Sequence, residues 1–167
     1  MASLPILANC AKKLSGMPRW QENGSAWKIA RISLISEIEG LDGLFLRLKA
    51  PNLRDGSGFL LQVEYQPGDA RGTEPLSRLE WRVGHTNPNL GPPEYRLLEC
   101  PGTHFHSFDL NYIDGEDRMR RSNLPLAEPV EPDPDTFEEL LAFGRKSLRI
   151  SDLDEISRPE FEGKFLP

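Results

Sequence analysis

Three histidines are the side chains best suited to chemistry in this chain, and all three lie within one 22-residue window. They are His85, His104 and His106, and the last two belong to the segment Gly102-x-His104-x-His106. Side chains two residues apart on a β-strand share a face, so His104 and His106 are expected to project together. The window predicts a β-hairpin with the segment around residues 76–83 as the second strand.

The second strand brings arginines to the histidines. Antiparallel pairing would place Arg78 or Arg82 beside them, which gives an acid/base pair next to a guanidinium suited to phosphate or carboxylate. One hypothesis is therefore a small metal-independent ribonuclease-type or phosphoryl-transfer enzyme, with one histidine as base, another as acid, and Arg78 or Arg82 stabilising charge.

A metal site is the second chemical hypothesis for the same window. Two histidines from a strand and His85 from a loop form a three-nitrogen set of the kind that holds zinc. Glu80 and Asp109 are the carboxylates that could support such ligands. No other cofactor is indicated by the sequence.

A structural role is the third hypothesis, and it competes with both. Histidines on a half-exposed strand often bond to loop carbonyls and hold a hairpin together. Phe108 and Leu110 continue the row of His104 and His106, which indicates partial burial. His85-Thr-Asn87-Pro88 reads as a turn in which Asn87 caps backbone groups. Cys100 lacks the features of a nucleophile.

The elements that must position these residues are mostly short strands. Alternating apolar residues predict strands over residues 44–49 and 59–65, and further strands are expected over 27–38, 76–83, 94–100 and 103–112. Helices are expected over residues 6–14 and from Asp133-Pro134 to Gly144, followed by a short turn after Ser151. Turn-length links predict an antiparallel sheet.

The fold class that follows is α+β, with a mostly antiparallel sheet of five to six strands and an N-terminal and a C-terminal helix packed on it. At 167 residues, the chain is expected to form a single domain over residues 1–167. Residues 113–133 are acidic and rich in proline, and they predict a solvated connector to the C-terminal helix.

Charge limits the partners of the protein. The formal net charge is −6, but residues 1–54 carry 8 basic and 4 acidic side chains, whereas residues 122–167 carry 5 and 11. Binding of nucleic acid by the whole domain is disfavoured, and a local basic patch from the N-terminal third is the alternative. Two cysteines and the lack of a long apolar run predict a soluble, cytoplasmic protein without a membrane partner.

The motifs together resemble a known pattern. Pro75-Leu-x-Arg78-Leu, His85-x-Asn87-Pro88 and Gly102-x-His104-x-His106 are similar to those of an uncharacterised family of small bacterial and phage proteins. The resemblance covers residues 75–112, and the chain departs from the pattern in a longer connection over residues 88–102. The family looks like the small proteins of mobile elements that are linked with toxin–antitoxin or phage–host conflict systems.

The resemblance implies an accessory protein that binds a protein partner in a toxin–antitoxin-like or defence context. It makes Arg78, His85, Asn87, His104 and His106 the positions to test. The alternatives are the ribonuclease-type enzyme and the histidine-ligated metal-binding protein described above.

Overall fold

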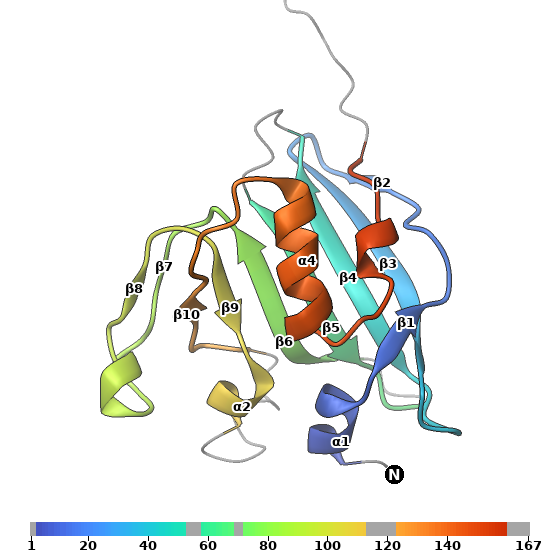
Figure 1. The fold of residues 1–167 in the computed structure, drawn as a ribbon, viewed down its shortest axis with the longest axis horizontal. Coiled ribbons are helices and arrows are strands. Elements are labelled where there is room, and N and C mark those ends of the chain that lie inside the picture. Colours follow the sequence, from blue (N-terminus) through green and yellow to red (C-terminus); the bar gives the residue numbers. More distant parts are fainter. Residues whose placement is uncertain (1–2, 53–57, 69–71, 113–122, 160–167) are drawn as a thin grey trace, which may run out of the picture.

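The computed structural model describes residues 3–52, 58–68, 72–112 and 123–159. The fold is α+β with a mostly antiparallel sheet, as expected, and Figure 1 shows one long helix lying across that sheet. The described part of the chain forms these elements: α1 (Leu4–Asn9), β1 (Lys12–Leu14), β2 (Gln21–Asn23), β3 (Trp27–Ser36), β4 (Leu44–Pro51), β5 (Phe59–Tyr65), β6 (Glu74–Trp81), β7 (His85–Thr86), a 3₁₀ turn (Pro93–Tyr95), β8 (Glu99–Cys100), β9 (His104–His106), α2 (Phe108–Asn111), β10 (Glu128–Pro129), α4 (Phe137–Ser147) and a 3₁₀ turn (Leu153–Glu155).

The main sheet is larger than the five to six strands expected. Its described part has eight strands in the order β1-β3-β4-β5-β6-β9-β10, with β2 also paired to β3. The additional strands β1, β2 and β10 are two or three residues long. Such short segments carry no readable periodicity, so the sequence pattern did not predict them.

The central strands β3 to β6 divide the sheet into an apolar and a polar face. Ala30, Leu48, Leu61 and Leu79 stand opposite one another on neighbouring strands and are all buried. Side chains one residue along each strand point to the other face, because successive residues of a strand alternate.

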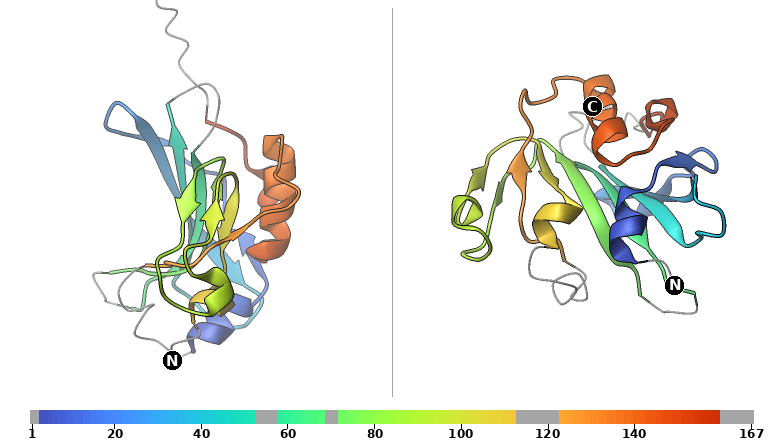
Figure 2. Two further views of the ribbon diagram at one scale, coloured as in Figure 1. Left: turned by 90° about the vertical axis from the view of Figure 1, so that its left-hand side faces the viewer. Right: turned by 60° about the horizontal axis from the view of Figure 1, so that its bottom comes forward.

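Helix α4 covers the apolar face. It begins after Thr136, whose side chain and Glu139 form a capping box, rather than at Asp133-Pro134 as expected. Gly144 lets the helix approach closely, since a β-carbon there would lie 3.3 Å from Leu79 and 2.9 Å from Leu153. Figure 2 shows α4 on one side of the sheet and no described helix of similar length on the other.

Three other predicted elements differ from the structure. The expected helix over residues 6–14 ends at Asn9, and the chain continues as β1 against β3. The expected strand over 94–100 is reduced to β8, because Pro92 and Pro93 lead into a 3₁₀ turn. The expected strand over 103–112 ends at His106, because Ser107 accepts a hydrogen bond from Leu110 and caps α2.

The histidine window is not a simple hairpin. Strands β6 and β9 pair directly, but residues 82–103 between them leave the sheet and form an arm that contains the separate β7–β8 pair. In Figure 1, this arm projects beside β9 and β10.

The connector to α4 is described only from residue 123 onward; the earlier part of residues 113–133 lies outside the described residues. The described part differs from the expected solvated connector. Its residues Leu124, Leu126, Ala127 and Val130 are buried, and β10 pairs with β9. No helix in the described ranges is long and apolar enough to cross a membrane.

Candidate metal centre

The floor of the candidate centre is the pair of strands β6 and β9. Arg78 stands opposite His106 and Glu80 stands opposite His104. Their neighbours Leu79 and Phe105 point toward α4, where Phe105 meets Phe143 at a ring distance of 6.0 Å. The alternation of a strand therefore places both histidines on the face that α4 does not cover.

His85 reaches this floor from the arm. It lies in β7, opposite Cys100 of β8, and two residues later Asn87 is buried. The Asn87 amide donates to the carbonyls of Tyr95 and Ala127 at 2.9 and 2.8 Å. These bonds fix the base of the arm to the segment that leads into β10. Asn87 is therefore a long-range anchor rather than the local turn cap expected.

The three imidazole rings form a nearly equilateral cluster. The ring centroids of His85 and His104 are 5.1 Å apart, those of His85 and His106 4.9 Å, and those of His104 and His106 5.1 Å. One ring nitrogen from each residue lies within 4.8 Å of the other two. His104 and His106 are 1% and 0% exposed, and His85 is half-buried.

Hydrogen bonds fix which nitrogen of His85 is protonated. Because the Asn87 nitrogen donates to two carbonyls, its Oδ1 is the atom that accepts from the Ala127 N–H at 2.8 Å. The same Oδ1 lies 3.0 Å from Nε2 of His85, and the Pro125 carbonyl lies 3.3 Å away. Both partners are acceptors, so Nε2 carries the proton and Nδ1 keeps its lone pair.

His104 has the opposite tautomer. Its Nδ1 lies 3.2 Å from the Gly102 carbonyl, so Nδ1 is the donor and Nε2 keeps the lone pair. That Nε2 is buried without a hydrogen-bond partner, and Oε2 of Glu80 is 3.7 Å away. Burial lowers the pKa of His104, although Gly102 and Glu80 oppose this shift. The imidazole is neutral at physiological pH.

His106 is neutral as well. Burial, and then the positive charge of Arg78, lower its pKa to about 2. Arg78 Nη2 lies 3.2 Å from His106 Nε2, and arginine can only donate, so Nε2 is the acceptor. Nδ1 has no hydrogen bond of standard geometry. The two buried histidines of the cluster are therefore neutral, which is the state that binds a metal ion.

Glu80 and Arg78 border the cluster. Arg78 Nε lies 2.7 Å from Glu80 Oε1, and Glu80 Oε2 lies 3.7 Å from Nε2 of His104. Glu80 therefore faces the nitrogen of His104 that would bind a metal, whereas a supporting carboxylate would accept from Nδ1, which is bonded to Gly102 instead. Asp109, the other carboxylate considered, is exposed on α2.

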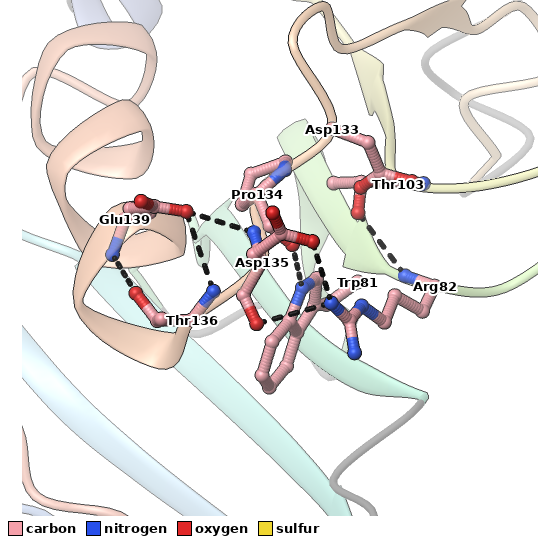
Figure 3. A network of polar contacts seen from close by, with 8 residues as sticks. All are labelled: Trp81, Arg82, Thr103, Asp133, Pro134, Asp135, Thr136 and Glu139. Carbon is pink, nitrogen blue, oxygen red and sulfur yellow. Dashed lines mark hydrogen bonds and ion pairs between the residues drawn. The ribbon is translucent and has the colours of Figure 1, made fainter.

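Arg82 is directed elsewhere. Its strand ends at Trp81, and Arg82 adopts a φ of 55°, which breaks the alternation that would have aligned it with Arg78. Its guanidinium instead contacts the carbonyl and carboxylate of Asp135 at 3.0 and 3.3 Å, as Figure 3 shows. Its backbone N–H donates to the Thr103 hydroxyl.

Gly102 lies against the carboxylate of Asp133, which a β-carbon at this position would meet. Asp133 is exposed, so its side chain has room to rotate away. That carboxylate accepts a hydrogen bond from the Thr103 N–H at 3.4 Å. This hydrogen bond links the start of the histidine strand to the segment before α4.

Asn111 is a supporting residue that the sequence analysis missed. It is completely buried, and its amide pairs with both backbone groups of Leu126 at 2.8 and 2.9 Å. It does for Leu126 what Asn87 does for Ala127. An asparagine between apolar residues just after the histidine strand was the available signal, because buried amides need fixed partners.

Cys100 is not a nucleophile in this structure. Burial raises the pKa of its thiol, and Glu128 raises it further. A reactive cysteine needs the opposite shift, so Cys100 is a packing residue opposite His85.

Comparison of the chain with protein-family models, with curated proteins and with solved structures finds no match.

Proposed function

We propose that this protein binds a divalent transition metal, zinc first, through His85, His104 and His106. The observation that supports this is the cluster itself, in which a nitrogen of each residue lies within 4.8 Å of the other two. In a tetrahedral zinc site with bonds of about 2.0–2.1 Å, ligand nitrogens lie about 3.3 Å apart. The ligand nitrogens would therefore have to approach one another by up to about 1.5 Å when the metal binds.

Ligand chemistry favours zinc over harder cations. Imidazole nitrogens suit zinc, copper, iron and nickel, whereas magnesium and calcium take oxygen ligands. Both His85 and His104 have their second nitrogen bonded to a carbonyl or amide oxygen. Such bonds orient metal-binding histidines and make them better ligands.

Burial of the centre favours a metal that stabilises the fold. Two ligands belong to β9 and the third to the arm, so one ion would tie the arm to the sheet. His104 and His106 are almost fully buried, which leaves little access for a substrate. Metal binding by a preformed native site stabilises the folded chain, by about 2.7 kcal/mol at a free metal concentration 100 times Kd.

The contact between Arg78 and His106 favours a second candidate function. A metal at Nε2 of His106 requires Arg78 Nη2 to leave that lone pair and stay with Glu80. Without a metal, the same contact places a guanidinium beside an imidazole, as the phosphoryl-transfer hypothesis requires, but His104 and His106 would have to become accessible to a phosphate. The two candidates predict different effects of Arg78→Gln. If the site binds zinc, the substitution removes a competing cation and should tighten zinc binding about tenfold. If the site transfers phosphoryl groups, the substitution should abolish phosphodiester cleavage.

Metal analysis of the untagged protein tests the proposal. The chain has no histidines besides these three, so zinc binding that depends on histidine reports on this centre alone. We expect one zinc per chain by elemental analysis and by titration calorimetry. His104→Ala and His106→Ala should each weaken binding by more than about 100-fold, since loss of a residue that only supports a ligand already costs about 10- to 100-fold.

Cysteine variants are the matched control. Cys10 and Cys100 are both buried free thiols, and Cys10→Ser and Cys100→Ser should leave the zinc stoichiometry unchanged. Binding of less than about a tenth of an equivalent by the wild-type chain, or equal affinity in the histidine variants, would reject the metal centre. The role of accessory binding protein in a toxin–antitoxin-like or defence context stays a prediction, as does the cytoplasmic location.

A further inference from the structure

A row of polar side chains crosses the face of the sheet opposite α4 and ends at the histidine cluster. Arg31 of β3 stands opposite Arg47 of β4, Arg47 opposite Gln62 of β5, Gln62 opposite Arg78 of β6, and Arg78 opposite His106 of β9. Directly opposed residues share a face of the sheet. With neighbouring strands about 4.8 Å apart, the row is about 19 Å long.

The outer end of this row is accessible. Arg31 and Arg47 are exposed, Gln62 and Arg78 are half-buried, and exposure falls toward His106. Helix α4 lies on the other face, as the edge-on view in Figure 2 shows. A hollow of about 440 Å³ opens at the exposed end, with Arg19, Arg31 and Arg47 among its lining residues.

The arginines differ in what holds them. Arg31 is tied to the buried carboxylate of Glu64 at 2.8 Å, and Arg78 contacts Glu80. Arg47 has no ion pair or hydrogen bond with any residue in the described ranges. A charged side chain without a partner in the middle of a cationic row is suited to an anionic ligand.

Aromatic rings border the row on the same face. Phe45 lies under the Arg31 guanidinium at 3.6 Å, and Trp27 lies under the Lys49 ammonium at 3.9 Å. Both rings are half-buried. Cationic side chains with interleaved aromatic rings on a sheet are typical of surfaces that bind single-stranded nucleic acid, where bases stack and phosphates pair with arginine.

The residues concerned come mainly from the N-terminal third of the chain, which carries 8 basic and 4 acidic side chains. Folding thus concentrates positive charge on one face of a protein whose net charge is −6. Charge complementarity favours a polyanion on this face.

We propose that the exposed end of the face opposite α4 binds single-stranded nucleic acid. The backbone phosphates would pair with Arg31, Arg47 and Arg78, and bases would stack near Phe45 and Trp27. The bound strand would run across the sheet toward His106. This inference goes beyond metal binding and does not depend on it.

Fluorescence anisotropy with labelled 12-nucleotide oligo(U) and oligo(dT) tests the proposal, at 50 mM salt and in the presence of EDTA so that failure of the metal centre has no influence. We expect binding by the wild-type chain and about tenfold weaker binding by Arg47→Ala. The slope of log affinity against log salt should fall by about 0.7, the value for one phosphate contact on a single strand. Arg47→Lys should retain most of the affinity.

Lys146→Ala is the matched control, because Lys146 is an exposed cation on α4, on the opposite side of the sheet. Its affinity should equal that of the wild type, and Phe45→Leu should bind about fivefold more weakly. Absence of wild-type binding to both oligonucleotides at 50 mM salt would overturn the proposal. So would equal loss in Arg47→Ala and Lys146→Ala, or competition by poly-glutamate as effective as that by unlabelled oligonucleotide, which would indicate an acidic protein partner.

Discussion

The two faces of the main sheet follow opposite rules. The face under α4 is formed by aliphatic side chains such as Leu61 and Leu79, each with no exposed surface. The other face carries arginines, Gln62, glutamates and two histidines on the same strands, one residue out of phase. One face therefore provides most of the apolar burial that stabilises the chain, and the other keeps the groups that can bind ions and ligands.

The largest effect should come from the covered face. Leu61→Ala is expected to lower the free energy of unfolding by about 2–5 kcal/mol, because it opens a cavity in a packed core. Leu60 is half-buried one residue along the same strand, on the face opposite α4. Leu60→Ala should therefore lower the free energy of unfolding by less than about 1 kcal/mol. Denaturant unfolding of both variants measures the difference, and similar losses would show that the two faces are not energetically distinct.

The two buried asparagines separate support of the fold from support of the metal centre. Asn87→Ala and Asn111→Ala each strip backbone groups of buried partners and should each cost about 1–3 kcal/mol of stability. Only Asn87 contacts a histidine, so only Asn87→Ala should also weaken zinc binding, by about 10- to 100-fold. Calorimetric titration of both variants with zinc is the decisive measurement. Equal zinc affinities would contradict the assigned role of Asn87.

Acid should destabilise the metal-free protein through the polar face. The pKa of His106 is about 2 in the folded chain and about 6.5 when unfolded, so below pH 6.5 the unfolded state takes up a proton that the native state does not. The contribution of His106 is complete above pH 6.5 and falls by up to about 1.4 kcal/mol per pH unit as pH decreases from there. His104, whose pKa burial also lowers, adds a loss in the same direction.

Urea unfolding between pH 7.5 and 5.0 in EDTA measures this slope. His106→Gln removes the titrating group and should flatten the profile by about the same amount. A wild-type profile without slope above pH 5 would contradict the buried, neutral state of His106.

The smallest expected effect lies at the start of α4. Thr136→Ala removes the capping box and should cost about 1 kcal/mol. Zinc affinity should stay unchanged, because Thr136 contacts no residue of the cluster. A change in zinc affinity, followed by calorimetry, would mean that the covered face and the centre are more tightly coupled than these contacts indicate.

The sequence predicted the long strands but not the short strands β1, β2, β7 and β10, for a physical reason. Strands β4 and β5 each have several alternating residues buried on one face, so period-two alternation is visible. Strands β7 and β10 have two residues each, too few for a visible alternation. Strand β8 also has two residues, and it was predicted as part of a longer strand over residues 94–100. Helix α2 was predicted as strand because the alternation of residues 104–110 continues through it. The Ser107 cap starts a helix there instead.

The candidate centre was partly predictable. His104 and His106 had to share a face, and the pairing of Arg78 with His106 follows from antiparallel register once β6 and β9 are neighbours. The contact of His85 with the other two histidines was not predictable. His85 belongs to an arm of about twenty residues that has no repeating pattern from which its path could be inferred. Arg82 does not join the cluster, because its own positive φ ends the alternation of β6 and turns its side chain away.

The contacts around Gly102 connect the two faces. Hydrogen bonds of Thr103 with Asp133 and Arg82, and of Arg82 with Asp135, join the segment before α4 to the histidine strand. Figure 3 shows the bonds of Arg82. The two faces of the sheet are therefore linked by direct contacts at this end. We therefore expect that a ligand or subunit that shifts the start of α4 also displaces Thr103, the immediate neighbour of His104. Binding on the face under α4 would then change the geometry of the histidines on the other face.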